Sequence, residues 1–281
     1  MANFKVLYNP LSGHCDPEQI KADLGKHLEG DSLEYFDITK IENIAQFVRS
    51  GDENILLVGG DGTINRFIND TKLDFKNSVY YYAAGNGNDF WTDIGRKTGD
   101  APVCIDEYLK NLPTVTVNGK DYKFINGVGY GIDGYCCEVG DKLKAAGKKV
   151  NYTSIAIKGL LFHHKPSTAQ VTVDGVTKTY KKAWIAPTMH GRYYGGGMIP
   201  TPEQDRSAKE RKVSTCLFYG KGRLKTLMAF PSIFKGEHVK KTKMVDVLEG
   251  KEVTVKFSRP TALQIDGETI LGVTEYTVKA N

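Results

Sequence analysis

The order of apolar runs and helical patterns over the first third of the chain limits its fold more than any other feature. Segments with apolar residues at helical spacing alternate with apolar runs short enough to be single strands. The apolar runs are residues 4–8, 33–38, 53–60 and 79–84, and the helical segments are 18–28, 41–48 and 62–69. This β-α-β order predicts a parallel sheet with helices on both faces. Ligands of such sheets bind at the carboxyl ends of the strands, where the loops gather.

The pattern changes after Pro113. Short runs that alternate in polarity or carry β-branched residues follow one another, as antiparallel strands do. One helical stretch, at about residues 134–163, interrupts them. A chain of 281 residues is long enough for two domains. The sequence therefore predicts an α/β domain over residues 1–115 and a β-rich domain over residues 116–281, packed closely with a cleft between them.

Composition excludes several classes of protein. Hydrophobic residues make up 40% and charged residues 25% of the chain, which excludes a disordered, collagen-like or coiled-coil protein. No apolar run approaches the ~20 residues that cross a bilayer, and no secretory signal is visible at the start. The cysteines form no C-x-x-C pair, which predicts a reduced, cytoplasmic protein without structural zinc. They are Cys15, Cys104, Cys136, Cys137 and Cys216.

Charge is distributed unevenly along the chain. Residues 1–115 carry 11 Lys and Arg against 18 Asp and Glu, a net charge of −7. Residues 116–281 carry 27 against 15, a net charge of +12. The second part is therefore expected to face an anionic partner, which is a membrane surface, a nucleic acid or a phosphorylated substrate. A solvated lysine-rich surface is the alternative.

The strongest local motif is Gly-Gly-Asp-Gly-Thr at residues 59–63, directly after an apolar strand and before a helix. Adjacent glycines let the backbone turn sharply and approach a ligand. The free N–H groups at a helix start bind phosphate oxygens. Asp61 adds a carboxylate suited to Mg²⁺ held between phosphates and protein. An ordinary tight turn is the alternative.

Two further polar loops follow predicted strands. Residues 8–13, Tyr-Asn-Pro-Leu-Ser-Gly, follow the first strand, and residues 85–90, Gly-Asn-Gly-Asn-Asp-Phe, follow the strand at 79–84. In the second loop Asn88 is a candidate helix cap and Asp89 a second metal-binding carboxylate. The first loop alone is equally compatible with a plain turn. Together, three loops at successive strand ends predict one site for an anionic ligand.

Three further segments carry motif-like patterns. Residues 129–134 match G-x-G-x-x-G, but they lie in the β-rich part and no acid follows about 20 residues later, so a dinucleotide site is rejected. His163 and His164 lack a third metal ligand nearby and are interpreted as a polar helix end. Asp266-Gly267-Glu268 places two carboxylates around a glycine, suited to acid–base work. Asp-Gly is also a strong signal for a simple hairpin.

Together these residues resemble the diacylglycerol kinase catalytic-domain family of soluble bacterial lipid kinases, related to sphingosine and ceramide kinases. The resemblance covers nearly the whole chain, and its motifs occur in the family's order. They are N-P-x-S-G (9–13), G-G-D-G-T (59–63), N-D-F (88–90), F-x-N…G-x-D (124, 126, 131 and 133), G-G-G-M (195–198) and D-G-E (266–268). The resemblance implies a Rossmann-like nucleotide-binding domain followed by an antiparallel β-sandwich domain that carries the lipid substrate, with the active site in the cleft between them.

The resemblance also implies a reaction and roles for residues. The expected activity is transfer of the γ-phosphate of ATP, with Mg²⁺, to the hydroxyl of a diacylglycerol-like lipid, in phospholipid metabolism. Glu268 is implied as the general base with Asp266 beside it, and Asp61 and Asp89 as the residues that organise Mg²⁺. The implied ATP-binding residues are Asn9, Pro10, Ser12, Gly13, Thr39, Gly59, Gly60, Asp61, Gly62, Thr63, Asn65, Gly85, Asn86 and Asn88.

Two positions depart from the family pattern. Residues 202–212 contain no Asp-Gly pair where many members have a D-G-x-L-D type run that holds a structural Mg²⁺. Asn86 stands where the usual residue is threonine. An NAD kinase-like small-molecule kinase and a catalytically silent relative that binds nucleotide or membrane remain as alternatives.

The sequence predicts a lipid substrate as the partner and predicts that the protein does not bind nucleic acid. A homodimer is compatible with the sequence. A helix around Ile155, Ile157, Leu160, Leu161 and Phe162, flanked by Lys158 and Lys165, is a candidate for peripheral contact with an anionic membrane. Packing of this helix on the sheet is the alternative.

Overall fold

A computed structural model describes residues 1–13 and 16–281. The chain forms two compact units, Met1–Leu112 and Pro113–Asn281, called unit 1 and unit 2 below. The predicted boundary at residues 115/116 lies inside β6 (Thr114–Val117), and unit 2 begins directly before that strand. The fold class is mixed α/β, as predicted, with a parallel sheet in unit 1 and an antiparallel sandwich in unit 2.

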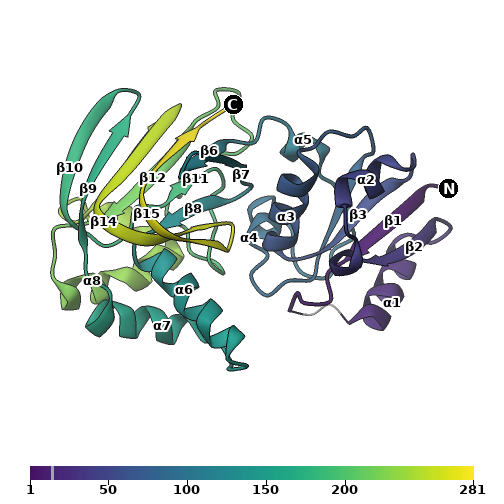
Figure 1. Ribbon diagram of the computed structural model, residues 1–281, viewed down its shortest axis with the longest axis horizontal. Helices are drawn as coiled ribbons and strands as arrows, with labels where there is room; N and C mark the ends of the chain where they lie inside the picture. Colours follow the sequence, from purple (N-terminus) through teal and green to yellow (C-terminus); the bar gives the residue numbers. More distant parts are fainter. Residues whose placement is uncertain (14–15) are drawn as a thin grey trace. The chain divides into compact units, whose positions relative to one another are not determined.

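Unit 1 is built on a sheet with the strand order β2-β1-β3-β4-β5 (Figure 1). The first four of these strands pair in parallel, and β5 joins β4 antiparallel. The strands are β1 (Asn3–Tyr8), β2 (Ser32–Asp37), β3 (Asn54–Gly59), β4 (Val79–Ala83) and β5 (Val103–Cys104). The helices are α1 (Pro17–His27), α2 (Ile44–Arg49), α3 (Asp61–Thr71), α4 (Asp89–Asp93) and α5 (Asp106–Leu109), with a 3₁₀ turn η1 (Ile38–Lys40). The predicted β-α-β order is confirmed.

Helices cover both faces of this sheet because side chains alternate along each strand. On one face Ile20 and Leu24 of α1 join a buried cluster with Val6 of β1 and Val58 of β3. On the other face Tyr81 of β4 contacts the aromatic rings of α4. Layers on both faces leave the strand ends and their loops as the place where polar groups gather.

Unit 2 is antiparallel throughout its described pairings, and most of its strands follow the order β13-β12-β11-β8-β14-β15-β6-β7. The remaining strands are β9, which pairs with β14, and β10, which pairs with β9. After β6 the strands are β7 (Lys120–Lys123), β8 (Gly127–Tyr130), β9 (Ser167–Val173), β10 (Val176–Ala183), β11 (Thr188–Met189), β12 (Val213–Phe218), β13 (Val245–Gly250), β14 (Glu252–Ile265) and β15 (Glu268–Lys279).

β14 changes neighbours along its length. Its residues 253–257 pair with β9, whereas residues 263–265 pair with β8. Between these stretches the register with β15 shifts, and Pro260, which has no N–H to donate, lies in this interval. A strand that bends at a bulge can serve both layers of a sandwich, and this bend directs the end of β14 toward β8.

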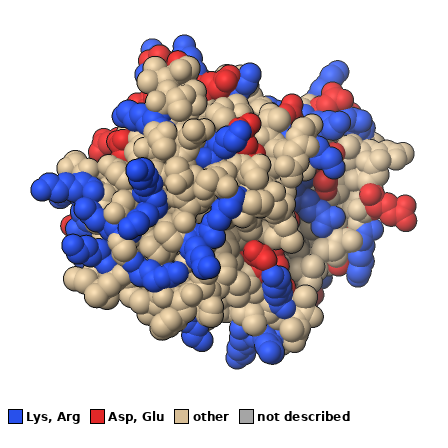
Figure 2. Space-filling model, turned by 60° about the vertical axis from the view of Figure 1, so that its left-hand side comes forward, with Lys and Arg blue, Asp and Glu red and all other residues tan. Residues whose placement is uncertain are grey.

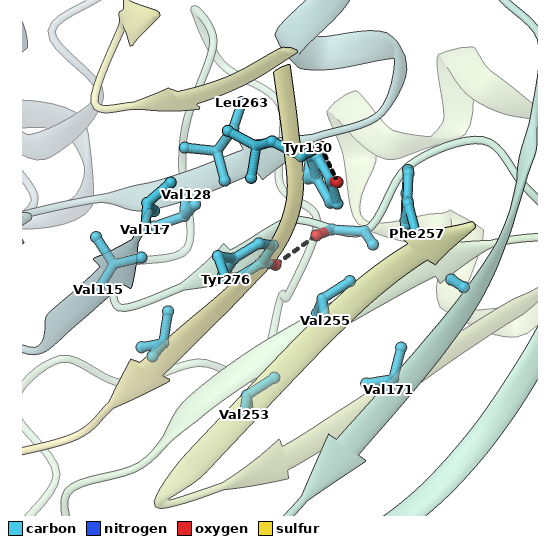
Figure 3. Packing of buried hydrophobic residues seen from close by; sticks show 14 of the residues in the cluster. Val115, Val117, Val128, Tyr130, Val171, Val253, Val255, Phe257, Leu263 and Tyr276 are labelled. Carbon is cyan, nitrogen blue, oxygen red and sulfur yellow. Dashed lines mark hydrogen bonds between the residues drawn. The ribbon is translucent and has the colours of Figure 1, made fainter. Parts of the chain in front are cut away.

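The core of unit 2 lies between these strands (Figure 3). The ring of Tyr130 stacks on that of Phe257 with centroids 4.0 Å apart. The buried hydroxyls are paired: Tyr130 donates to the carbonyl of Val273 at 2.6 Å and Tyr276 to that of Ala186 at 2.7 Å. These hydrogen bonds offset the cost of removing the hydroxyls from water, so large aromatic side chains can fill this core.

Helices occur in two stretches of unit 2, of which the sequence predicted one. The predicted stretch contains α6 (Ile132–Ala145), α7 (Tyr152–Lys158) and a π-helical turn η2 (Gly159–His163). The second stretch contains α8 (Arg223–Ala229) and the 3₁₀ turns η3 (Phe230–Lys235) and η4 (Glu237–Lys240). It was missed because Gly220, Gly222 and Pro231 break its helical pattern into short pieces.

The described cysteines carry free thiols: Cys104, Cys136, Cys137 and Cys216. Cys15 lies outside the described residues. Among the described helices, none combines the length and the apolar character needed to cross a lipid bilayer.

Candidate functional site

Loops at the ends of β1, β3 and β4 meet in unit 1, as the sequence predicted. The closest approach is between Gly60, after β3, and Gly85, after β4. A Cβ atom on Gly85 would lie 2.4 Å from the Cα of Gly60, well inside van der Waals contact. Only glycine allows these two backbones to come so close.

The side chain of Thr63 joins the first loop to the second. Its Oγ1 accepts a hydrogen bond from Nδ2 of Asn9 at 3.0 Å and lies 3.2 Å from Oγ of Ser12. Thr63 is 4% exposed, and a Cβ on Gly59 would lie 2.3 Å from its hydroxyl. Three residues predicted to bind ATP therefore contact one another and hold the N-P-x-S-G loop against the start of α3.

The carboxylate of Asp61 joins the second loop to the third. Its oxygens accept hydrogen bonds from the backbone N–H groups of Asp89 and Phe90, both at 2.9 Å. These N–H groups belong to the first turn of α4, where a negative charge also interacts favourably with the helix dipole. These bonds place Asp61 next to Asp89, the other residue predicted to bind the metal.

The third loop is closed by its own side chains. Oδ1 of Asn88 accepts from the N–H of Gly85 at 3.0 Å, and its Nδ2 donates to the Gly85 carbonyl at 2.8 Å. Asn88 occupies the N-cap position of α4, but its side chain makes no capping bond to the helix, contrary to the expectation. Asn86 extends toward the first loop, since a Cβ on Gly13 would lie 2.0 Å from Asn86 Oδ1.

The other predicted ATP-binding residues lie at the same edge of the sheet or in α3. Thr39 follows β2, and its hydroxyl donates to the Asp37 carboxylate at 2.6 Å. Asn65 is buried in α3, where its carbonyl and Oδ1 accept from the Asn69 amide. Pro10 and Gly62 lie in the first loop and the first turn of α3.

The chemistry of these loops fits a phosphate group and Mg²⁺. The backbone N–H groups of Gly60 and Gly62 have no partner among the described residues, and they lie at the start of the eleven-residue helix α3. Carboxylates and phosphate oxygens are the hard ligands that Mg²⁺ prefers, and one or two protein carboxylates suffice. No group of three or more His, Cys, Asp or Glu side chains suited to a metal occurs in the described residues.

In unit 2 the Asp-Gly-Glu motif forms a two-residue hairpin turn between β14 and β15. Ile265 pairs with Glu268, and Asp266 and Gly267 have φ values of +45° and +100°. The carboxylate of Asp266 accepts three backbone hydrogen bonds, from Ile125 at 2.6 Å and from Asn126 and Gly127 at 2.9 Å. Asp266 is 9% exposed, so these bonds lie in the interior and fix the turn against the segment before β8.

Glu268 differs from Asp266 in every respect. It is the first residue of β15, it is exposed, and its side chain forms no hydrogen bond or ion pair with another described residue. The rigid turn therefore presents one free carboxylate, next to one that is used structurally. A carboxylate held on a rigid turn but free of partners can accept a proton from a bound hydroxyl.

The hairpin is also linked to a buried acid that sequence reasoning did not count as a site residue. Oε1 of Gln264 accepts from the N–H of Gly267 at 2.6 Å, and its Nε2 donates to Asp133 Oδ2 at 2.9 Å. Burial raises the pKa of Asp133 to about 6, although the Gln264 bond acts in the opposite direction. The inward-facing position of Gln264 in its strand, two residues before Asp266, was the available signal.

Arg206 supports the same segment from the other side. Its guanidinium donates to the Ile125 carbonyl at 3.0 Å and to Asn126 Oδ1 at 3.1 Å, and the residue is 7% exposed. Arg206 lies in residues 202–212, the stretch that departs from the family pattern. The sequence shows that the Asp-Gly pair is missing there, but only the fold shows that a buried cation from this stretch meets residues 125 and 126.

The glycines of the G-x-G-x-x-G match serve packing. A Cβ on Gly129 would lie 1.4 Å from Asp133 Oδ2, one on Gly131 2.3 Å from the Trp184 carbonyl oxygen, and one on Gly134 1.9 Å from the Ala262 carbonyl oxygen. Protein atoms fill the space that a bound phosphate would need, in agreement with the rejected dinucleotide site. His163 is the last residue of η2, and burial lowers the pKa of His164 to about 4.

Comparison with known proteins shows the family to which the chain belongs. Residues 3–117 match the diacylglycerol kinase catalytic domain, and residues 126–280 match the YegS C-terminal domain, described as NAD kinase beta sandwich-like. The chain belongs to the lipid kinase family, with a diacylglycerol kinase-like catalytic domain followed by a YegS-type C-terminal domain.

Individual relatives agree with this family. The chain is 26% identical over 249 residues to a diacylglycerol kinase of Mycobacterium tuberculosis, a match that covers 83% of this chain and 79% of the relative. Among solved structures, a "putative diacylglycerol kinase" from Bacillus anthracis str. Sterne superposes with a TM-score of 0.68 at 15% identity, covering 99% of this chain and 93% of that chain. A yeast NADH kinase complexed with NADH gives a TM-score of 0.51 at 11% identity, with coverage of 100% and 80%. At these identities the two structures show a shared fold.

Proposed function

We propose that this protein is a lipid kinase that uses ATP and Mg²⁺ and transfers the γ-phosphate to the hydroxyl of a diacylglycerol-like lipid. The observation that carries the proposal is the joining of three loops in unit 1 by Gly60, Thr63 and Asp61. This arrangement brings the free N–H groups of Gly60 and Gly62 together with Asp61 and Asp89, the groups that a triphosphate with a divalent cation requires.

In this proposal the nucleotide binds to unit 1. The N–H groups of Gly60 and Gly62 contact phosphate oxygens, and the glycines keep side chains out of the way. Asp61 and Asp89 would hold Mg²⁺, directly or through water, and the ion would supply positive charge that offsets the charge of the phosphates.

The acceptor belongs to unit 2 in this proposal. Glu268 takes the proton from the lipid hydroxyl, since it is the free carboxylate of the hairpin. Asp266 holds the turn through its three backbone bonds and does not itself move a proton. Phosphoryl transfer then depends mainly on position and charge neutralisation, because a side chain has little covalent chemistry to perform.

The direct test is transfer of labelled phosphate from Mg-ATP to a panel of diacylglycerol, sphingosine, ceramide and NAD. The proposal requires label in a lipid, and loss of that label in Glu268→Gln but not in the exposed control Glu275→Gln on the same strand. Failure of every lipid to accept phosphate, while ATP binding is measurable, would contradict a lipid kinase and favour a silent relative.

A second candidate is an NAD kinase-like enzyme. It is favoured by the fold shared with the yeast NADH kinase and by the description of the C-terminal family as NAD kinase beta sandwich-like. The same panel distinguishes it, because label in NAD and in no lipid would replace the lipid acceptor with a dinucleotide.

A further inference from the structure

Arg206 is a buried cation in the stretch that departs from the family pattern. Of the Lys and Arg residues that the structure describes, only Lys5 and Arg206 are buried. Figure 2 shows how Lys and Arg side chains otherwise gather at the surface, where water solvates their charge. A buried charge is costly unless hydrogen bonds or an opposite charge compensate for it. The contacts that compensate this cost therefore show what Arg206 does in the fold.

One peptide group lies between the Arg206 guanidinium and the Asp266 carboxylate. Nη1 of Arg206 donates to the carbonyl oxygen of Ile125 at 3.0 Å. The N–H of Asn126, at the other end of the same peptide group, donates to Asp266 Oδ1 at 2.9 Å. Each of these hydrogen bonds polarises the peptide group in the direction that strengthens the other bond. The guanidinium thus acts on the Asp266 carboxylate through the peptide group between them.

Further contacts fix the orientation of Asn126. Nη2 of Arg206 donates to Asn126 Oδ1 at 3.1 Å. The carbonyl oxygen of Asn126 accepts from the N–H groups of His190 and Gly191, at 2.8 and 3.0 Å. The backbone N–H, the carbonyl and the side chain of Asn126 all have partners, so this residue cannot turn without the loss of several hydrogen bonds. Because Asp266 holds its hairpin against this residue, Arg206 is linked to the position of the hairpin.

The loop at 202–212, which carries Arg206, is closed by its own hydrogen bonds. Nε2 of Gln204 donates to the carbonyl of Lys212 at 3.0 Å. Nη1 of Arg211 donates to the carbonyl of Arg206 at 2.9 Å. Both bonds join parts of the loop that are several residues apart, so the Arg206 side chain enters the interior from a backbone whose position is fixed.

This loop does not fit a structural Mg²⁺ ion. Its three carboxylates, on Glu203, Asp205 and Glu210, are all exposed. Oδ1 of Asp205 already accepts a hydrogen bond from the N–H of Ser207 at 2.8 Å. A structural Mg²⁺ ion needs oxygen ligands that converge on one point. The side chain that this loop buries is instead a cation, which repels Mg²⁺.

We propose that Arg206 takes the place of a structural Mg²⁺ ion in this chain and is a positioning residue for Glu268. The guanidinium fixes the segment at 125–127, this segment fixes Asp266, and Asp266 fixes the hairpin that presents Glu268. Unit 2 accordingly folds without a divalent cation. The positioning of a general base rests on the proposed function, whereas the independence of the fold from metal does not.

The first measurement is thermal unfolding of the full-length, nucleotide-free protein in EDTA and in excess MgCl₂. We expect midpoints within about 2 °C of each other, because no metal stabilises the fold. A larger fall in EDTA that persists in Asp61→Asn, which lacks the proposed metal-binding carboxylate of unit 1, would show a structural metal and overturn the proposal. This measurement uses an intact Arg206, so it decides the question even if substitution of Arg206 prevents folding.

The second measurement is chemical rescue of Arg206→Ala. This variant lacks the buried guanidinium, so free guanidinium ion, far below denaturing concentrations, should bind in its place. We expect a lower unfolding midpoint that guanidinium raises and NaCl of equal ionic strength does not. In phosphate transfer, kcat should fall about a hundredfold, with the KM for Mg-ATP changed by less than about twofold, because the hairpin is displaced and the nucleotide loops are intact. Guanidinium should restore kcat about tenfold.

Arg223→Ala is the matched control. Arg223 also donates to two backbone carbonyls, those of Leu160 and His164, both at 2.8 Å. These carbonyls lie outside residues 125–127 and outside the hairpin. Arg223→Ala should therefore lower the unfolding midpoint but keep a kcat near that of the wild type, when both are measured well below their midpoints.

Three results would contradict the role of Arg206. They are an unfolding midpoint of Arg206→Ala that guanidinium does not raise, a wild-type kcat in Arg206→Ala, and an equal loss of kcat in Arg223→Ala. A wild-type protein that phosphorylates no acceptor would contradict the proposed function alone. The effects of EDTA and guanidinium on unfolding would then still decide whether Arg206 replaces a metal.

Discussion

Asp266 accepts a hydrogen bond at 2.9 Å from the backbone N–H of Asn126, a residue 140 positions earlier in the chain. Together with the bonds from Ile125 and Gly127, this contact sets the position of the hairpin that carries Glu268. The two acids of one motif therefore have separate tasks, which mutation can distinguish.

Removal of the Glu268 carboxylate should abolish phosphate transfer without weakening the fold. For Glu268→Gln we expect a fall in kcat of about a hundredfold to ten-thousandfold, the usual contribution of a general base. The midpoint of thermal unfolding should stay within about 2 °C of wild type, because the side chain is exposed and forms no hydrogen bond or ion pair with the described residues. Calorimetry should show unchanged ATP binding. Full activity in this variant would exclude Glu268 as the base.

Removal of the Asp266 carboxylate should instead weaken the fold. Asp266→Ala leaves three buried N–H groups without an acceptor, so the free energy of unfolding should fall by about 3–5 kcal/mol. Denaturant unfolding measures this loss, and Glu268→Gln serves as the neighbouring control. If Asp266→Ala were as stable as the wild type while activity disappeared, Asp266 would have a chemical role in place of a structural one.

The approach of Gly85 to Gly60 predicts a large effect from one methyl group. Gly85→Ala places a Cβ 2.4 Å from the Gly60 Cα, so the two loops must separate and ATP affinity should fall tenfold or more, by about 1.4 kcal/mol. Gly25→Ala, in the exposed part of α1 with nothing near its Cβ, should instead stabilise the protein by about 0.5–1 kcal/mol. Equal nucleotide affinity in both variants would show that the loops do not bind ATP.

Burial of Asp133 predicts a dependence of stability on pH. Its pKa is raised to about 6 in the folded protein, against about 4 in the unfolded chain, so the folded state binds more protons between these values. Its contribution is therefore complete below pH 4 and is lost as pH rises to 6, by about 3 kcal/mol. Asp133→Asn removes this term while keeping an acceptor for Gln264.

The measurement for Asp133 is the difference between wild type and Asp133→Asn in denaturant unfolding from pH 4 to pH 7. His164 titrates with the opposite sign, since burial lowers its pKa to about 4 and its contribution is lost as pH falls from about 6.5. The difference between the two proteins cancels this contribution. A difference that does not change with pH would show that Asp133 has an ordinary pKa.

Lysine should not be able to replace Arg206. Arg206→Lys keeps the charge but loses the planar fork that reaches both the Ile125 carbonyl and Asn126 Oδ1, so we expect a loss of about 2–4 kcal/mol in unfolding free energy. Lys209→Gln, an exposed cation in the same loop, should change nothing measurable. If lysine replaces Arg206 without loss, charge alone is sufficient there.

Local patterns were enough to predict most of unit 1. Apolar runs of strand length, separated by helical spacing, specify a parallel sheet, and the handedness and short connections of such units leave few other topologies. The convergence of the loops at 9–13, 59–63 and 85–90 followed from that topology. The sequence also predicted the Asp-Gly hairpin, because an Asp-Gly pair between alternating runs favours one turn type.

Contacts between residues far apart in the chain could not be predicted from local sequence patterns. The three bonds to Asp266, the Gln264–Asp133 pair and the Arg206 contacts join segments separated by 80 to 141 positions. No periodicity records such pairs, because each depends on how the bent strand β14 packs beside β8. Helix α8 was not predicted either, because glycines and a proline divide its helical spacing of apolar residues.

The sequence by itself thus determined the class of fold, the family and the residues that carry charge and hydrogen-bonding groups at the strand ends. Tertiary structure alone decided which of these groups take part in hydrogen bonds within the protein. Asp266, Asp61 and Thr63 are bonded to backbone or side-chain partners, whereas the Glu268 carboxylate is left free. The physical reason is that hydrogen-bond satisfaction and burial are properties of three-dimensional neighbours, and a motif specifies only the residue types that are available to become neighbours.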